Sequence, residues 1–378
     1  MYTGVLIDSD VHHNWVSDDE LVSYLPRRWR EFARGNGREK PSLEPAIMSY
    51  PHPHGVNKRL DTYGPAGQRP GSHYETMRDQ LLDPFNVERA ILSYDIGGNA
   101  GLWNPYLAAE VVRAANDWSI DHWLSRRDPR LYGAVLIPMQ VPDEAAREIR
   151  RVGSHSRMAE VLIVANALGR PFGHPVYDPI FKAASELGLP VAIHAGTDLL
   201  GAAHTAAGGV PANRLEFHTL APQGIVHAVT SLISHGTFEK FRDLKVLIVE
   251  IGVTWVPWLI WGLDAHYEIL RAESPLVKRR PSEYFREHVR LTTQPLEISP
   301  QPEQLVELLQ AFGGMEDVLC FATDYPHWDA DDPLYIAGKL PSSWHSKIFY
   351  ENARVLYGWS DLPSRAPIAP QARPAVQA

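Results

Sequence analysis

The regular alternation of helical stretches with short apolar runs constrains the fold of this sequence more than any other feature. Between residues 73 and 194 the pattern repeats four times. The helical stretches and the apolar runs that follow them are 73–85 with 89–93, 105–125 with 132–137, 142–151 with 159–164, and 177–187 with 190–194. Strands that alternate with helices at this spacing predict right-handed βαβ units and a parallel sheet.

The pattern extends toward both ends of the chain. Further strands are expected at 5–7, 244–250, 289–293 and 318–323, and further helices at 17–34, 222–234, 254–264, 303–312 and 342–357. Eight strands with helices between them, and no linker, predict a single (β/α)8 TIM-like barrel over residues 1–359. The Gly-, Pro- and His-rich stretch 35–71 is expected to be an insertion after the first strand. The Pro- and Ala-rich tail 360–378 is expected to be disordered.

Composition excludes several classes of protein. The chain has 378 residues, 44% of them hydrophobic, so it can bury a large core. A net charge of −9 argues against binding to nucleic acid or to an anionic membrane. No apolar segment is long enough to span a bilayer and no secretory leader is evident, so a cytoplasmic protein is expected. The single cysteine, Cys320, excludes an internal disulfide and a thiolate zinc cluster.

Several of the expected strands end in residues that can bind a metal. Asp10 and His12 follow the first strand and share one of its faces, His194 ends the fifth, and Asp324 follows the eighth. Two of these signals have an ordinary alternative, since Asp-x-His is common by chance and Asp324 could cap a turn. Together at the carboxyl ends of barrel strands, two imidazoles and two carboxylates predict a catalytic divalent ion, zinc or manganese.

Other polar residues surround the expected site. Glu250 ends the sixth strand, and His327 lies just beyond Asp324. We expect both to support the metal and the substrate without being ligands, the alternative being that Glu250 pairs with a lysine or arginine. His218 and His235 flank the helix expected at 222–234, and either could be a catalytic imidazole or a helix-end residue.

The sequence also resembles the amidohydrolase-related branch of the amidohydrolase superfamily, which includes aminocarboxymuconate-semialdehyde decarboxylase and the resorcylate-type decarboxylases. The resemblance lies in five segments: 7–12, 189–194, 237–246, 323–327 and 351–357. It implies a TIM-like barrel with one metal ion held by Asp10, His12, His194 and Asp324. The chain departs from the family where Glu250 replaces a catalytic histidine on the sixth strand, and His218 or His235 could supply the imidazole. It also has Asp-x-His where many members have His-x-His or Glu-x-His.

Three functions fit these observations. We expect first a metal-dependent decarboxylase of a small carboxylated aromatic or enol-like substrate, with Asp324 or a nearby imidazole as the proton donor. The alternative is hydrolysis of an amide, ester or lactone, with Asp324 as general base and Glu250 or His218 assisting the leaving group. The third is a non-catalytic, metal-stabilised binding module.

The resemblance further implies a homodimer. The insertion is expected to form a lid whose arginines, Arg38, Arg59 and Arg69, could meet a substrate carboxylate. The tryptophans in 254–264 recur at helical spacing and are expected to pack into the core.

Overall fold

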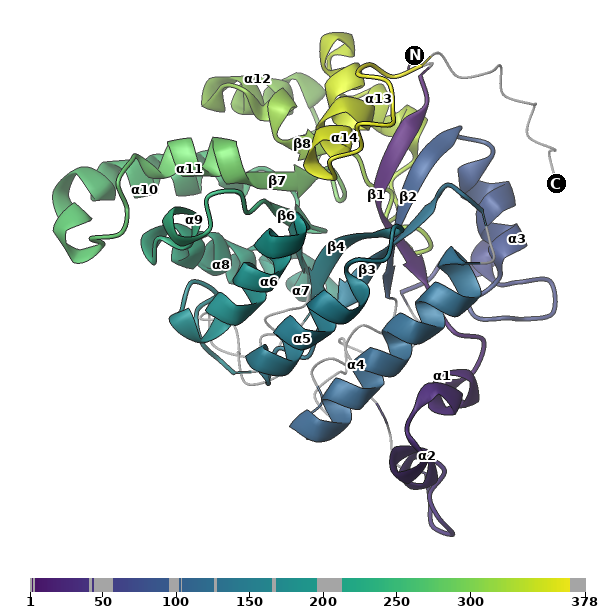
Figure 1. Cartoon of the computed structure of the whole chain (residues 1–378). Coiled ribbons are helices and arrows are strands. Elements are labelled where there is room, and N and C mark those ends of the chain that lie inside the picture. The colour runs from purple at the N-terminus through teal and green to yellow at the C-terminus, as the bar shows by residue number, and fades with distance from the viewer. Residues whose placement is uncertain are drawn as a thin grey trace.

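The computed structural model describes residues 2, 4–40, 43, 57–94, 102, 104–125, 128–164, 168–195 and 213–367. Eight parallel strands form one sheet in the order of the chain, with helices between and around them (Figure 1). The strands are β1 (Leu6–His13), β2 (Val87–Tyr94), β3 (Leu131–Leu136), β4 (Met158–Ile163), β5 (Val191–His194), β6 (Val246–Val249), β7 (Val289–Thr292) and β8 (Leu319–Cys320). Consecutive strands pair in parallel throughout, from β1 with β2 to β7 with β8.

The backbone after β8 closes the sheet onto β1. The amide of Ser9 donates to the carbonyl of Phe321 at 3.0 Å, and the amide of Asp324 donates to the carbonyl of Asp10 at 3.1 Å. A parallel bridge joins Val11 to Tyr325. The first and last strands therefore meet, and the predicted (β/α)8 barrel is confirmed.

The helices follow the predicted pattern, and many of them begin at a proline. Proline fits the first turn of a helix because the backbone N–H groups of that turn have no acceptor within the helix, so the absence of one costs nothing. The α-helices are α1 (Asp18–Tyr24), α2 (Arg27–Ala33), α3 (Tyr74–Met77), α4 (Pro105–Ser119), α5 (Pro142–Val152), α6 (Asp178–Leu187), α7 (Arg214–Leu220), α8 (Pro222–Ser234), α9 (Thr237–Lys240), α10 (Trp255–Leu270), α11 (Pro281–His288), α12 (Pro302–Phe312), α13 (Pro333–Ala337) and α14 (Asn352–Leu356).

Short 3₁₀ and π segments extend or connect these helices. They are η1 (Leu60–Thr62), η2 (Arg78–Leu82), η4 (Ile120–Leu124), η5 (Pro175–Tyr177), η6 (Arg271–Glu273), η7 (Met315–Asp317), η8 (Ser342–Trp344) and η9 (Lys347–Glu351). The single helix expected at 17–34 is two helices, because Pro26 stands between α1 and α2 and lacks the amide hydrogen that a continuous helix needs.

The core lies inside the barrel and between its strands and helices. All residues of β4, β5, β6 and β8 are buried, including Cys320. The prediction for the tryptophans of α10 was only partly right. Trp255 is buried, but Trp258 and Trp261 are 68% and 52% exposed.

The expected insertion and tail are only partly within the described residues. Residues 41, 42 and 44–56 of the insertion lie outside them. Residues 57–59 pair with the loop after β8, where the amide of Arg59 donates to the carbonyl of Pro326 at 3.1 Å. Of the tail expected from residue 360, residues 360–367 are described: Asp361 pairs with Arg89, and the Val5 amide donates to the Pro367 carbonyl. Residues 368–378 lie outside the described part.

In the part of the chain that the structure describes, no helix combines the length and the apolar character that a bilayer crossing requires.

Candidate metal centre

The carboxyl end of β1 positions the first two candidate ligands. The pairing of β1 with β2 is irregular between Asp8 and Val11, and such bulges re-aim side chains at strand ends. The Ser93 hydroxyl, from β2, donates to Oδ1 of Asp10 at 2.6 Å. That bond leaves the second oxygen, Oδ2, turned toward the imidazoles of His12 and His194 at 3.6 and 3.4 Å.

His194, from β5, and Asp324, from the backbone after β8, each contact one of these two residues. Nε2 of His12 lies 2.9 Å from Oδ1 of Asp324. The rings of His12 and His194 meet edge to face with centroids 5.2 Å apart. The structure thus brings together all four residues that the sequence singled out as metal ligands.

The chemistry of these four side chains fits a divalent ion. Each is at most 7% exposed, and each carries a ligand atom without a hydrogen-bond partner among the described residues. These atoms are Oδ2 of Asp10, Nε2 of His12, Nε2 of His194 and Oδ2 of Asp324. Leaving buried polar atoms unsatisfied costs about 1–3 kcal/mol each, and a cation between them would remove that cost. Two imidazoles and two carboxylates, with no thiolate, suit manganese or zinc.

The protonation of the cluster shows how its charges compensate one another. Burial alone would raise the pKa of Asp10, but the imidazoles of His12 and His194 outweigh it and hold that pKa well below its usual value. Burial likewise opposes the charging of His194, yet Asp10 and Glu250 raise its pKa to about 9. A bound cation would replace these protons, because imidazoles bind metal in their neutral form.

Two carboxylates of the site occupy an uncommon backbone conformation. Asp324 and Glu250 both have φ of 60°, in the left-handed region that side chains other than glycine rarely adopt. The turn at Asp324 is held by Asp8, whose carboxylate accepts bonds from the Thr323 amide at 3.0 Å and the Thr323 hydroxyl at 2.6 Å. Such strain, held by its surroundings, is concentrated at functional sites.

His327 lies closer to the cluster than its place in the sequence suggested. Its Nδ1 is 2.5 Å from Oδ1 of Asp324, and its ring centroid is 4.3 Å from that of His12. Burial acts to lower the pKa of His327, Asp324 acts to raise it, and Lys58 and His12 oppose Asp324; the net effect is a pKa above the usual value. One nitrogen of His327 also lies within 4.8 Å of ligand atoms of His12 and Asp324.

Glu250 lies on the other side of the cluster. Its Oε2 is 3.5 Å from Nδ1 of His194, and one of its oxygens lies within 4.8 Å of oxygens of Asp324 and Asp329. Burial and the charge of Asp324 raise the pKa of Glu250 to about 7. Among the described residues, Glu250 thus contacts an imidazole of the site, and not the lysine or arginine of the alternative hypothesis.

The two remaining histidines differ in position. His218, in α7, lies at the edge of the site, with Nδ1 3.9 Å from Oδ2 of Asp329 and its ring against Trp328. His235 ends α8, where burial and then His174 and Lys240 lower its pKa. No contact among the described residues joins His235 to the cluster, so the geometry gives no support to it as the replacement for the sixth-strand histidine.

Sequence reasoning missed three residues of this site: Ser93, Asp329 and Lys58. Ser93 is the last residue but one of β2, so its place near a strand end could have indicated it. Asp329 lies five residues beyond Asp324, so its closeness to a strand end could also have indicated it. No sequence pattern pointed to Lys58, because it is brought to the site by a backbone bridge between residues 58 and 327.

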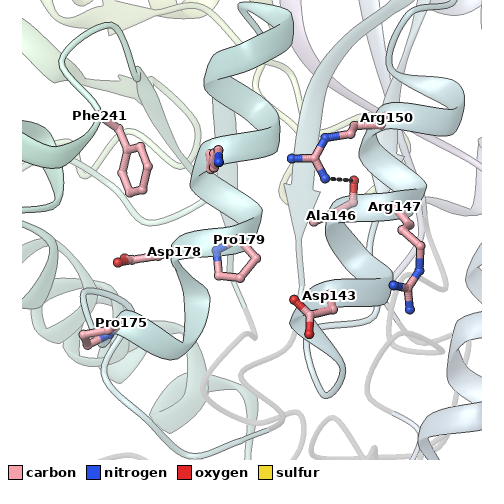
Figure 2. A pocket seen from close by; sticks show the side chains of 9 residues that line it. Asp143, Ala146, Arg147, Arg150, Pro175, Asp178, Pro179 and Phe241 are labelled. Carbon is pink, nitrogen blue, oxygen red and sulfur yellow. Dashed lines mark hydrogen bonds between the residues drawn. The ribbon is translucent and has the colours of Figure 1, made fainter.

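A separate groove lies on the outside of the barrel, between α5 and α6. It has a volume of about 660 Å³, and Figure 2 shows Asp143 and Arg150 on one side of it and Asp178 and Pro179 on the other. Three of its charged side chains form ion pairs, Arg147 with Glu144, Arg150 with Glu186 and Asp178 with Lys240. This groove therefore offers no cluster comparable to the one at the strand ends.

Comparison with known proteins agrees with this geometry. The sequence model of a family described as amidohydrolase matches residues 8–359. The gamma-resorcylate decarboxylase of Rhodococcus jostii (strain RHA1) is 26% identical over 315 residues, which cover 77% of this chain and 93% of that protein.

Two solved structures share the fold. An amidohydrolase from Mycobacterium avium subsp. paratuberculosis K-10 has a TM-score of 0.68 at 22% identity, covering 94% of this chain and 99% of its own. A dihydroxybenzoic acid decarboxylase from Polaromonas sp. JS666, with bound manganese and the inhibitor 2-nitroresorcinol, has a TM-score of 0.61 at 19% identity, covering 94% and 97%.

Proposed function

Because the chain belongs to the amidohydrolase family, we propose that it is a metal-dependent decarboxylase of a small carboxylated aromatic or enol-like acid. The observation that carries the proposal is the convergence of four buried ligand atoms, from Asp10, His12, His194 and Asp324, none with a hydrogen-bond partner among the described residues. The relatives add support, since both the Rhodococcus and the Polaromonas proteins are named as decarboxylases of aromatic acids.

The four residues would hold one divalent ion, and we favour manganese over zinc. Two of the four donors are carboxylate oxygens, which suit harder ions, and the Polaromonas structure contains manganese. When bound, the ion would supply positive charge that holds the substrate carboxylate and steadies the negative charge left as carbon dioxide departs.

The side chains of the site would then transfer a proton and orient the metal ligands and the substrate. His327 donates from Nδ1 to the carboxylate of Asp324, so a proton is held at this pair beside the cluster. We propose that the pair delivers a proton to the carbon that loses carbon dioxide. Ser93 fixes the orientation of Asp10, and Glu250 contacts Nδ1 of His194, the nitrogen that is not the proposed ligand atom, without being a ligand itself. His218 reaches the site through Asp329 and would contact the substrate.

Hydrolysis of an amide, ester or lactone is the alternative. One observation favours it, namely that burial and Asp324 raise the pKa of Glu250 to about 7, a value suited to proton transfer near neutrality. The two reactions give different products, so they can be separated directly.

The test is carbon dioxide release from a panel of hydroxylated benzoates and carboxyvanillates, with the protein loaded with manganese or zinc or stripped by a chelator. We expect release that depends on the ion and is greater with manganese. Hydrolysis of esters or lactones without carbon dioxide would reverse the assignment. Full activity in the chelator, with no ion found by elemental analysis, would remove the metal from the proposal.

We also propose a homodimer. Its support is the exposed apolar face of α10, where Trp258 and Trp261 are accessible and Ile269 is 79% exposed. Exposed aromatic residues gathered on one helix are typical of protein interfaces.

A further inference from the structure

The insertion after β1 brings one cation to the candidate metal centre. Residues 57–59 run antiparallel to the loop after β8, with a bridge between Lys58 and His327. The Trp328 amide donates to the carbonyl of Asn57 at 2.9 Å, and the Arg59 amide donates to the carbonyl of Pro326 at 3.1 Å. Directly opposed residues of two paired strands project their side chains to the same face, with Cβ atoms about 5 Å apart. Lys58 therefore shares a face with the imidazole that contacts Asp324.

The burial of neighbouring residues agrees with this direction. Lys58 is only 8% exposed, whereas the side chain of the next residue, Arg59, is 44% exposed and pairs with Asp61 at 2.6 Å. Side chains alternate along an extended segment, so Arg59 projects to the opposite face. The insertion arginine Arg69 likewise pairs with Asp18 at 2.8 Å. The cation directed toward the cluster is thus Lys58, and not one of these two arginines.

We propose that the ammonium of Lys58 binds the carboxylate of the substrate, and that this contact selects small aromatic acids over their neutral counterparts. The inference rests on the proposed function, because it assumes that the acid is the substrate. Lys58 would pair with the substrate carboxylate, beside the positive charge that the ion would supply. In a buried site such a charge-assisted bond is stronger than at the surface.

The experiment compares the binding of two ligands that differ only in the carboxylate. 2,6-Dihydroxybenzoate and resorcinol are titrated by calorimetry into the full chain loaded with manganese, and salicylate and phenol serve as a second pair. Lys58→Met keeps most of the aliphatic stem and removes the charge. We expect it to weaken binding of the acids about 10- to 100-fold and to leave binding of resorcinol and phenol within about threefold.

Two further variants separate the contact from a structural role. Arg59→Met is the matched control, since it removes a cation one residue away on the other face, and it should leave both affinities unchanged. Lys58→Arg restores a cation and should recover much of the affinity for the acids. If Lys58→Met fails to fold by circular dichroism, Lys58→Gln takes its place with the same expectation.

The outcomes distinguish this inference from the proposed function. Selective loss of acid binding without any carbon dioxide release from the wild type supports Lys58 and removes the decarboxylase. Carbon dioxide release with an unchanged Michaelis constant in Lys58→Met removes Lys58 and leaves the decarboxylase. Equal loss for acid and neutral ligand, an equal effect of Arg59→Met, or no binding of either acid by the wild type also overturns the inference.

Discussion

Asp324 and Glu250 hold their carboxylates at the site only because their backbones adopt φ of 60°. Glycine would relieve the strain at either position but would remove the carboxylate. Asp324 is held by backbone bonds to β1 and by the Asp8–Thr323 contacts, so its position is fixed before any ion binds. A ligand set fixed in this way binds an ion without the entropic cost of ordering its side chains.

Substitutions at the cluster should separate ligands from supporting residues. His194→Ala should abolish binding of the ion, because it removes one of four donors. Glu250→Gln and His327→Asn should retain most of the ion and lose about 10- to 100-fold in turnover. Elemental analysis and carbon dioxide release on the same samples measure both effects.

His235→Asn is the control for these variants, since His235 has no described contact with the cluster and both measurements should stay at wild-type values. Loss of the ion from Glu250→Gln would make Glu250 a ligand. Asp324→Asn gives a further check. If this variant binds the ion normally and the phenotype of the cell is unchanged, the non-catalytic alternative is favoured.

The candidate ligands could be predicted from the sequence because each lies at the end of an apolar run. Asp10, His12, His194 and Asp324 all met that criterion. The contact between His327 and Asp324 could not be read in the same way, since it depends on how the loop turns. The position of Lys58 could not be predicted from the sequence. It depends on a single bridge to His327, 269 positions away, and one bridge produces no periodic pattern in either segment.

Among the elements, all eight strands were expected at the right places, although β1 is longer and β8 shorter than the runs that predicted them, and several short helices were not expected. The helix expected at 222–234 is α8 with the same bounds, because an apolar stripe and Pro222 define it. The single helices α7 and α13 were missed, since seven- and five-residue helices show less than two full turns of periodicity. β8 is shorter than the run 318–323, because beyond Cys320 the backbone is joined to β1 by isolated hydrogen bonds, such as those at Phe321 and Asp324.

The hydrogen bond between Tyr357, just after α14, and Glu160, in β4, gives a prediction about how stability depends on pH. Burial raises the pKa of Glu160 to about 8, although the Tyr357 hydroxyl donates to its Oε2 at 3.0 Å and acts to lower it. Asp10 acts to raise that pKa and His194 to lower it. The unfolded chain has the ordinary pKa of about 4.3, so unfolding between these values releases a proton and stability falls as pH rises.

Glu160→Gln cannot ionise and should therefore lose less stability than the wild type between about pH 5 and 8, by on the order of a few kcal/mol. Thermal denaturation across this range, in chelator so that no ion alters the charges, is the measurement. The exposed Glu303→Gln, on α12, should follow the wild type. Parallel curves for Glu160→Gln and the wild type would show that Glu160 stays ionised in the fold.

At the scale of the whole molecule, the exposed tryptophans of α10 predict the oligomeric state. Wild-type protein should elute as a dimer in size-exclusion chromatography with light scattering. Trp258→Glu with Trp261→Glu should give a monomer, because two charges would be buried unpaired at the interface.

Val355→Glu, another exposed apolar position, should remain a dimer with the wild type. A wild-type monomer at micromolar concentration would contradict the proposed dimer, and a dimer in the double variant would place the interface elsewhere.

The seam between β1 and the backbone after β8 also sets the order in which the protein matures. Asp8 and Thr323, which hold the turn at Asp324, are 315 residues apart along the chain. A ribosome adding about 5–20 residues per second would expose Asp10 and His12 many seconds before Asp324 exists. The nascent chain therefore has only part of the ligand set during its synthesis. The ion that we propose would find its full set of donors only once the chain is complete, so a cell starved of the metal is expected to accumulate complete barrels without it.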